Sequence, residues 1–352
     1  MVKNLNKSLM RVLGLSFLVG MSSMSFADIV MNSGTNQASL SWSSEEANQL
    51  LNGDVSASVN KADEPSPQGS AKITTSIRSS NGAVQSSPTK TVQIFDTSAS
   101  FNQPLINARS ALVMDGQTGE VLYSKNSNTA FPIASITKLM TAVIIADARL
   151  NMSENITLQQ IDFAGAGGKN SSSTLRAGDS MNRAEALLFA LMKSENPAAA
   201  ALARTYPGGR AAFVSAMNAK AKSLGMNSTR YVESSGLDPR NISSARDLGI
   251  LVNSASQYGL IRQFSTTPSY DFNLGYRVLK SNNTNALVRN GGWNINISKT
   301  GYINEAGRCV VMHTTLNNRP AVVVLLGADS SAARTNDATK LMTWVSQLPK
   351  RI

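Results

Sequence analysis

The stretch FPIASITKLMTA, residues 131–142, places a lysine three residues after a serine inside a segment that is otherwise apolar. Five apolar residues here and just beyond follow the helical spacing i, i+3, i+4, i+7, i+8, namely Ile136, Leu139, Met140, Val143 and Ile144. Alanines and further aliphatic residues fill the flanks of this pattern. The spacing therefore predicts a helix that is central and buried.

Ser135 stands near the start of this helix, and Lys138 lies one turn later on the same side. The positive end of the helix dipole and burial both lower the pKa of a lysine, so a neutral amine becomes available as a base. A serine beside such a base is an activated nucleophile. Ser-x-x-Lys is a common pattern, however, and residues 87–90 match it too. A capping Ser135 with Lys138 reaching the surface is the alternative.

A second candidate element is Ser-Glu-Asn, residues 194–196, between the helical patterns 183–193 and 197–205. Pro197 is well suited to begin the second helix. A short junction of this kind can direct hydroxyl and amide groups into a cleft. Ser-x-Asn also occurs at 58–60, 153–155 and 180–182, so position alone favours Ser194 and Asn196.

A third element is Lys-Thr-Gly, residues 299–301, at the end of the strand pattern 294–302. Lys299 and Thr300 on an edge strand can hold a carboxylate. Gly301 lets an extended peptide approach the backbone closely. Each element is weak by itself, but the three together, on helix, loop and strand, indicate one site.

The remaining patterns predict an α+β fold. Residues 110–126 read as a hairpin, and residues 309–316 and 321–328 read as further strands. Helical patterns cover 183–193, 197–205, 209–224 and 332–347. We expect one five-stranded antiparallel sheet, assembled from both ends of the folded part and flanked by helices, with the middle helices forming a second, mostly helical lobe.

The N-terminal part differs in composition from the rest. Residues 1–27 are typical of a secretory signal peptide, with basic residues, an apolar run at 12–21 and Ser-Phe-Ala at 25–27. That run is shorter than the roughly 18 residues of a membrane span, and no later segment is long enough, so we expect export without a transmembrane anchor. Residues 28–100 hold 16 serines, which predicts a largely disordered segment.

The folded domain is expected over residues 101–352, which carry a net charge of +11 against −3 for residues 28–100. A basic surface suits an anionic polymer such as cell-wall glycan peptide, although it can equally lack a specific partner. No basic motif interleaved with aromatic residues points to nucleic acid. Cys309 and His313 are the only residues of their types, which argues against an internal disulfide and against the usual zinc sites. For His313, in an alternating strand pattern, a structural role is the prediction.

Together the three elements resemble the motif set of serine β-lactamases and penicillin-binding proteins. The chain is similar to low-molecular-mass penicillin-binding proteins of the D-alanyl-D-alanine peptidase family over about residues 105–347. Further likeness lies in MDGQTGEVLYSKN, in MNAKAKSLGMNST followed by ESSGLDP, and in WNINISKTGYINEAGRCVVM. Ser-Glu-Asn as the middle element and NGGWNINISKTGY around the third resemble the endopeptidase type of this family.

The resemblance implies a β-lactamase/D,D-peptidase-like fold and a serine peptidase that needs no metal and no other cofactor. It implies Ser135 as nucleophile, Lys138 as base, Ser194 as proton carrier near Lys138, and Asn196 as a positioning group. It further implies carboxylate binding by Lys299 and Thr300 beside Gly301, and an oxyanion hole made by the backbone N–H groups of Ser135 and Tyr302.

Peptidoglycan stem peptides are then the expected substrates, in the periplasm, with β-lactams as covalent inhibitors and cell-wall enzymes as possible partners. The motifs serve an endopeptidase and a carboxypeptidase equally well, so preference for the endopeptidase follows from resemblance alone. A β-lactamase would need a carboxylate to activate water, and Glu233 lies in the right region. A wall-binding or β-lactam-sensing module without catalysis is the remaining alternative.

Overall fold

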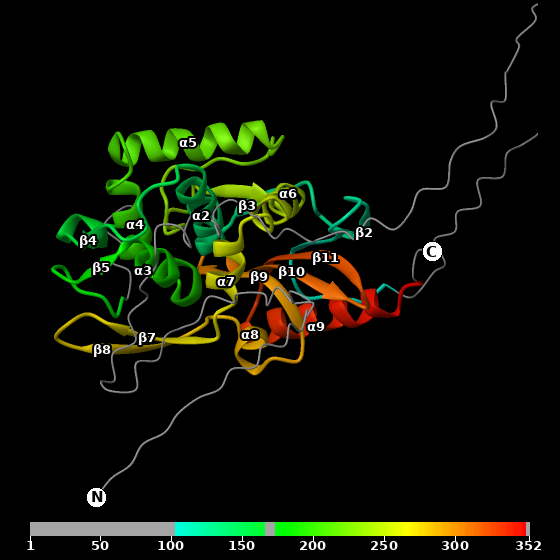
Figure 1. The fold of residues 1–352 in the computed structure, drawn as a ribbon. Coiled ribbons are helices and arrows are strands. Elements are labelled where there is room, and N and C mark those ends of the chain that lie inside the picture. The colour runs from blue at the N-terminus through cyan, green and yellow to red at the C-terminus, as the bar shows by residue number, and fades with distance from the viewer. Residues whose placement is uncertain (1–102, 166–172, 350–352) are drawn as a thin grey trace, which may run out of the picture. The chain divides into compact units, whose positions relative to one another are not determined.

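The structure is a computed structural model that describes residues 103–165 and 173–349. The predictions for residues 1–27 and 28–100 lie outside these ranges. A five-stranded antiparallel sheet has the strand order β2-β1-β11-β10-β9 (Figure 1). Its strands are β1 (Ser110–Asp115), β2 (Val121–Lys125), β9 (Asn294–Ile303), β10 (Gly307–Leu316) and β11 (Arg319–Ala328). The predicted sheet, built from both ends of the folded part, is confirmed.

Side chains of the central strands alternate between two buried layers. In β11, Val322 and Val324 pack into the cluster shared with the helical lobe, whereas Val323 and Leu325 pack into the cluster under α9 (Ser331–Gln347). Because successive side chains of a strand point to opposite faces, a strand covered on both sides is a continuous apolar run. This explains the continuous apolar runs at residues 309–312 of β10 and 320–326 of β11.

The residues between the two ends of the sheet form the expected helical lobe. Its helices are α2 (Thr137–Asp147), α3 (Arg183–Leu188), α4 (Asn196–Arg204), α5 (Gly209–Ser223), α6 (Ala245–Ala255) and α7 (Gly259–Thr266), with short helices η1 (Ala134–Ile136), η2 (Gln160–Phe163), η4 (Phe189–Lys193) and α8 (Ala286–Asn290). Short strand pairs are β3 (Ala130–Pro132) with β6 (Ile242–Ser244), β4 (Asn155–Thr157) with β5 (Ser180–Asn182), and β7 (Ser269–Asn273) with β8 (Val278–Asn282).

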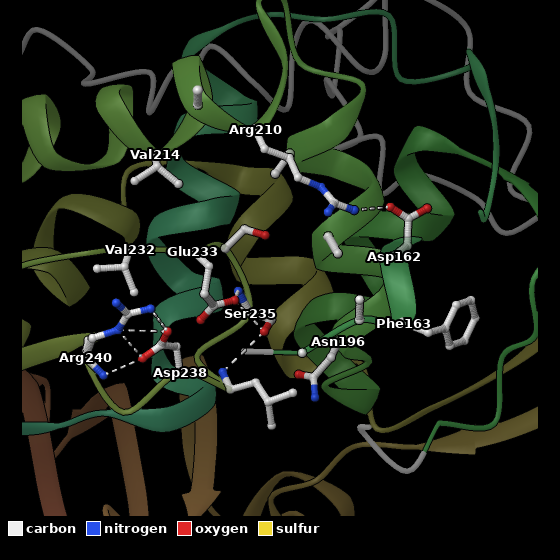
Figure 2. Close-up of a pocket in the computed structure, with 17 residues that line it drawn as sticks. Asp162, Phe163, Asn196, Arg210, Val214, Val232, Glu233, Ser235, Asp238 and Arg240 are labelled. Atoms are coloured by element: carbon white, nitrogen blue, oxygen red, sulfur yellow. Dashed lines mark hydrogen bonds and ion pairs between the residues drawn. The ribbon is translucent and has the colours of Figure 1, made fainter. Parts of the chain in front are cut away.

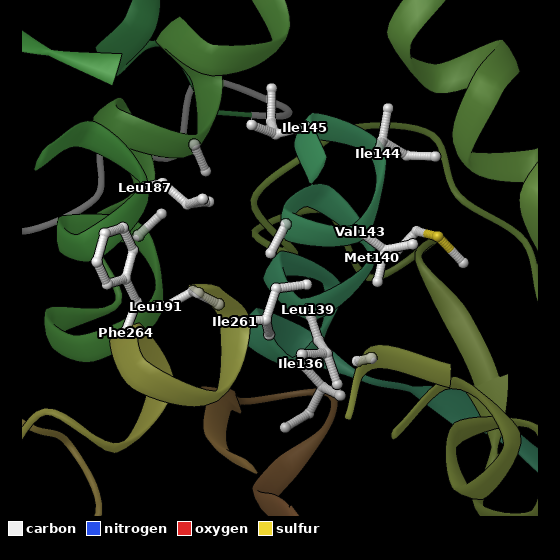
Figure 3. Packing of buried hydrophobic residues seen from close by; sticks show 14 of the residues in the cluster. Ile136, Leu139, Met140, Val143, Ile144, Ile145, Leu187, Leu191, Ile261 and Phe264 are labelled. Atoms are coloured by element: carbon white, nitrogen blue, oxygen red, sulfur yellow. The ribbon is translucent and has the colours of Figure 1, made fainter. Parts of the chain in front are cut away.

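Helix α2 is the centre of this lobe, as predicted. Residues 137–146 are all buried, so the helix is covered on every side. Figure 3 shows Leu139 of α2 beside Ile261 of α7, whereas Val143 and Met140 lie on another side of the helix. Fully burying one such aliphatic side chain contributes about 1.5 to 3 kcal/mol. The lysine in α2 is thus held inside a rigid apolar core.

Several details were absent from the sequence prediction or differ from it, and helices α6 and α7 and the strand pairs β3–β6 and β4–β5 are among those not predicted. The helix expected at 183–193 changes into the π-helix η4 at Phe189, and the β7–β8 hairpin was not predicted. Helix α2 itself begins at Thr137, so Ser135 lies on the 3₁₀ turn before it.

His313 lies in β10, where its ring faces Asn296 and Gly116. Within the described residues, no helix is long and apolar enough to cross a membrane.

Candidate functional site

Ser135 and Lys138 are brought together as predicted. The Lys138 Nζ donates a hydrogen bond of 2.8 Å to Ser135 Oγ. The same nitrogen donates to Asn196 Oδ1 at 2.6 Å and to the carbonyl oxygen of Ser235 at 2.7 Å. The lysine is fully buried, and burial lowers its pKa to about 7, against the opposing charges of Glu233 and Glu195. A large part of this amine is therefore neutral near pH 7 and able to accept a proton.

The loop between η4 and α4 supplies the second element. Helix η4 ends at Ser194, whose φ of 67° is left-handed, and Asn196 then begins α4 with Pro197 in its first turn. A π-helical turn of this kind is often found at functional sites. Ser194 Oγ accepts a hydrogen bond of 2.8 Å from Lys299 Nζ. Ser194 is therefore bonded to Lys299, whereas the contact with Lys138 that sequence reasoning gave to it is made by Asn196.

The third element lies along β9, at the edge of the sheet. Lys299 is buried, and its pKa lies well below the usual lysine value because of burial and then the charges of Lys138 and Arg334. Thr300 Oγ1 donates to Thr284 Oγ1 at 2.7 Å. A Cβ at Gly301 would stand 3.1 Å from the backbone nitrogen of Ser135. The missing side chain thus lets β9 pass directly beside the serine, and Tyr302 is the residue of β9 that follows Gly301.

The turn after Glu233 locks the serine from the other side. Gly236 has a φ of +84°, and a Cβ there would lie 1.8 Å from the carbonyl oxygen of Ala134. Ala134 itself has a φ of 48°, which is an uncommon conformation for a residue with a side chain. Backbone strain of this sort persists only where the surroundings impose it. Ser135 is therefore held in place by close backbone packing with Gly236.

Sequence reasoning treated Glu233 only as a possible water-activating carboxylate. Its two oxygens accept from the backbone N–H groups of Ser235 and Gly236, from the Ser235 hydroxyl and from the Asn241 amide. Since an ionised carboxylate has about four acceptor positions, this one is saturated by its own loop. Glu233 shapes the turn that presents the Ser235 carbonyl to Lys138, and this geometry disfavours its use as a base toward water.

Two other buried charged residues were missed as well. Glu195 accepts hydrogen bonds from Ser173 and Thr174, which ties the middle element to the loop beside it. Arg334 of α9 is 7% exposed and lowers the pKa of Lys299. Glu195 is part of the Ser-Glu-Asn element and could have been examined from the sequence. No sequence pattern indicates that Arg334 lies near Lys299.

A cavity of about 510 Å³ adjoins the site (Figure 2). Its wall includes Asn196, Glu233 and Ser235, together with side chains of η2, α4 and α5. Two of these residues contact Lys138 directly, whereas Ser135 is not part of the wall. The cavity therefore lies beside the lysine and does not form the groove along β9.

Two of the other Ser-x-Asn matches in the described residues lie away from this site. Asn155 of β4 pairs with Asn182 of β5, so the matches at 153–155 and 180–182 belong to one short hairpin. Within residues 103–165 and 173–349, no three His, Cys, Asp or Glu side chains gather in a way that would hold a metal ion. Cys309 is buried and has a free thiol.

Comparisons with known proteins agree with this geometry. The family model described as D-alanyl-D-alanine carboxypeptidase matches residues 97–330. A D-alanyl-D-alanine endopeptidase of Pseudomonas aeruginosa is 47% identical over 67% of this chain and 76% of its own length. One of Escherichia coli is 46% identical over 69% of this chain and 79% of its own length. The crystal structure of the Streptomyces K15 DD-transpeptidase superposes with a TM-score of 0.64 at 30% identity, covering 70% of this chain and 99% of that one.

Proposed function

Because the chain belongs to the D-alanyl-D-alanine carboxypeptidase family, we propose that it is a serine D-alanyl-D-alanine endopeptidase that cleaves peptide cross-links of peptidoglycan. The observation that carries this proposal is the buried Lys138 amine at 2.8 Å from Ser135 Oγ, in a chain whose 46–47% identical relatives are named endopeptidases. The bond cleaved would join a D-alanine carbonyl to the side-chain amine of diaminopimelate.

In the first half of the reaction, Ser135 Oγ attacks the carbonyl carbon while Lys138 takes the hydroxyl proton. General-base help of this kind contributes about 10²- to 10⁴-fold. The backbone N–H groups of Ser135 and Tyr302 stabilise the oxyanion, each contributing on the order of 10²-fold or more. The lysine proton then passes to the leaving amine through the Ser194 hydroxyl, which must turn from its bond with Lys299 toward Lys138 for this step. The carbon–nitrogen bond breaks to give an acyl-enzyme and a free amine.

The remaining groups hold the substrate. Asn196 Oδ1 is engaged by Lys138, so its amide nitrogen is left to donate to a substrate carbonyl. Lys299, Thr300 and Arg334 bind the carboxylate beyond the scissile bond, where the positive charge compensates the substrate's negative charge. Water then attacks the ester, Lys138 accepts its proton, and Ser135 is restored. A β-lactam would stop at the acyl stage and block the site.

The test is to incubate the purified chain with cross-linked muropeptide dimers and monomeric pentapeptides, and to follow products by chromatography and mass spectrometry. We expect dimers to become monomers, and the activity to vanish in enzyme pre-treated with benzylpenicillin. Loss of one alanine from pentapeptides with intact dimers would make it a carboxypeptidase instead. Rapid turnover of the penicillin would make it a β-lactamase, and no change in either substrate would favour a binding or sensing module.

The acylation rate is expected to rise with pH around a midpoint near 7. The pKa of Lys138 is lowered to about 7, and only the neutral amine can take the serine proton. Above about pH 8 the rate should level off. The measurement is the rate of acylation by a fluorescent penicillin between pH 5.5 and 10. A midpoint that stayed above pH 9 would contradict a lysine base in this environment.

Gly236→Ala is expected to lower the acylation rate about 10²-fold, because the new Cβ would displace Ala134 and with it Ser135. The matched control is Gly119→Ala in the β1–β2 turn. Gly119 has a similar φ of +75°, but nothing lies within 4 Å of its added Cβ. Both variants carry the cost of a left-handed alanine, so equal acylation rates in the two would refute the positioning role of Gly236.

We further propose that residues 1–27 are removed on export to the periplasm and that residues 28–100 remain on the mature chain. The expected N-terminal residue of the exported protein is Asp28. Intact mass measurement of protein recovered from the periplasmic fraction checks this directly. A mass that includes residues 1–27 would contradict cleavage, and a mass that begins near residue 101 would show that the serine-rich segment is lost.

A further inference from the structure

Positively charged side chains gather beyond the end of the Lys-Thr-Gly element. Arg308 of β10 lies directly opposite Tyr302 of β9, and its guanidinium carbon is 3.6 Å from the centroid of the Tyr302 ring. Arg334 projects from α9, and Arg289 from α8. We call Arg289, Arg308 and Arg334 the arginine rim.

The strand geometry places the rim on one face of the sheet together with Thr300. Thr300 and Tyr302 are two residues apart in β9, so their side chains point to the same face. Their partners across the ladder are Val310 and Arg308, and Val310 packs in the cluster under α9. Helix α9, which carries Arg334, covers this same face. Thr300 and Arg308 therefore lie on the face that α9 covers, next to the edge of the sheet where β9 has no further strand beside it.

The rim lacks a counter-charge within the described residues. Arg334 is only 7% exposed, yet its guanidinium makes no ion pair and no hydrogen bond with residues of the described ranges. Its pKa is lowered by burial, and the charges of Arg308 and Arg289 lower it further. Arg334 is buried, Arg308 is half-buried and Arg289 is exposed. Holding the buried Arg334 charge near two like charges is unfavourable unless an anion joins them. A binding site for anionic groups explains the arrangement.

The charge of the rim exceeds what one carboxylate requires. Free D-alanine, the leaving group of a carboxypeptidase, carries one carboxylate, which the proposed function assigns to Lys299, Thr300 and Arg334. The leaving group of an endopeptidase is a whole stem peptide with several carboxylates. We propose that Arg308 and Arg289, with Tyr302, form a second carboxylate subsite that binds this leaving stem and favours cross-linked substrates. This inference rests on the proposed function.

The contact between Arg308 and Tyr302 suits such a subsite. The Tyr302 hydroxyl donates to Asn304 Oδ1 at 2.8 Å, which fixes the ring, and the residue is 47% exposed. A guanidinium that lies over an aromatic face keeps the N–H groups of its edge free. Two parallel hydrogen bonds from that edge match the geometry of a carboxylate. Arg289 is oriented in turn by a hydrogen bond of 2.6 Å from its Nη1 to the carbonyl oxygen of Asn283.

The experiment compares three substrates: a cross-linked dimer, the same dimer with the more distant carboxylates of its leaving stem amidated, and a depsipeptide that releases D-lactate with a single carboxylate. The variants are Arg308→Gln and Arg289→Gln. The control is Arg246→Gln, which removes one exposed charge from α6. For wild-type enzyme we expect amidation to lower kcat/KM about 10-fold, mainly through KM, and added salt to weaken the difference.

In Arg308→Gln we expect kcat/KM for the unmodified dimer to fall about 10- to 100-fold, with amidation then making little further difference. For the depsipeptide, kcat/KM of Arg308→Gln should fall no more than about 3-fold below the wild-type value. If amidation of the dimer lowered kcat/KM by the same factor in Arg308→Gln as in wild type, the subsite would be overturned. An equal fall of kcat/KM on the depsipeptide and on the dimer in Arg308→Gln would overturn it as well. A wild-type enzyme that cleaved the depsipeptide but neither dimer would overturn the endopeptidase proposal itself, and the subsite with it.

Discussion

Replacing Ser135 by alanine is expected to abolish the acyl adduct with benzylpenicillin and to lower dimer cleavage by at least about 10⁴-fold. Removal of the nucleophile leaves only the general base, the oxyanion hole and substrate binding, and such groups act as a unit with the serine. Intact mass spectrometry after incubation with penicillin measures the adduct directly. Chromatography of muropeptides measures the cleavage.

The fold should tolerate this change. The Ser135 side chain makes one hydrogen bond, to Lys138, and a hydrogen bond contributes roughly 1 kcal/mol to stability. The matched control is Ser87→Ala, which removes the serine of another Ser-x-x-Lys pattern. Full activity in Ser87→Ala with none in Ser135→Ala would assign catalysis to the pattern at Ser135 and Lys138. An adduct that persisted in Ser135→Ala would refute the proposed nucleophile.

Replacing Lys138 by methionine is the change with the second largest expected effect, a fall in acylation rate of about 10³-fold. Methionine keeps most of the apolar volume but cannot accept the serine proton. Because the titrating amine is removed, the residual acylation rate of Lys138→Met should no longer depend on pH near 7. If Lys138→Met kept the wild-type pH profile, the titrating group would be another residue.

The same variant tests the lowered pKa through folding stability. Between pH 7 and the usual lysine pKa of 10.5, the unfolded chain holds a proton at Lys138 that the folded chain has released. Stability of the wild type therefore rises with pH across this window, relative to Lys138→Met. Below pH 7 both states hold the proton, and the difference is constant. Melting temperatures of both proteins from pH 6 to 10 check this, and a parallel pair of curves would contradict it.

The local patterns of the sequence were sufficient for the main elements. The apolar spacing at 136–144 predicted the buried helix α2, and the apolar runs near both ends predicted the sheet. The three motif elements were also found, because each is a short run of letters within one turn or one strand. Local spacing carries this information, since helices and strands have fixed periods.

The sequence did not reveal which elements meet or what holds the reactive groups. Lys138 donates a hydrogen bond to a backbone carbonyl 97 residues away. Because every residue has a backbone carbonyl, the residue types in the sequence do not indicate which one is the partner. Lys299 donates a hydrogen bond to Ser194 across 105 residues, although the family resemblance had implied Lys138 as the partner of that serine. Glu233 was visible as a carboxylate, but only folding showed that its own loop saturates it.

The sequence by itself thus determined the elements, the family resemblance and the reactive residue types. Tertiary structure alone decided the partners of those residues, the extent to which the pKa of Lys138 is lowered and the arginine rim along β9. The physical reason is that pKa values and hydrogen-bond partners depend on burial and on distances of a few ångströms. Such distances are set when segments far apart in the chain pack against one another, and no spacing within one segment encodes them.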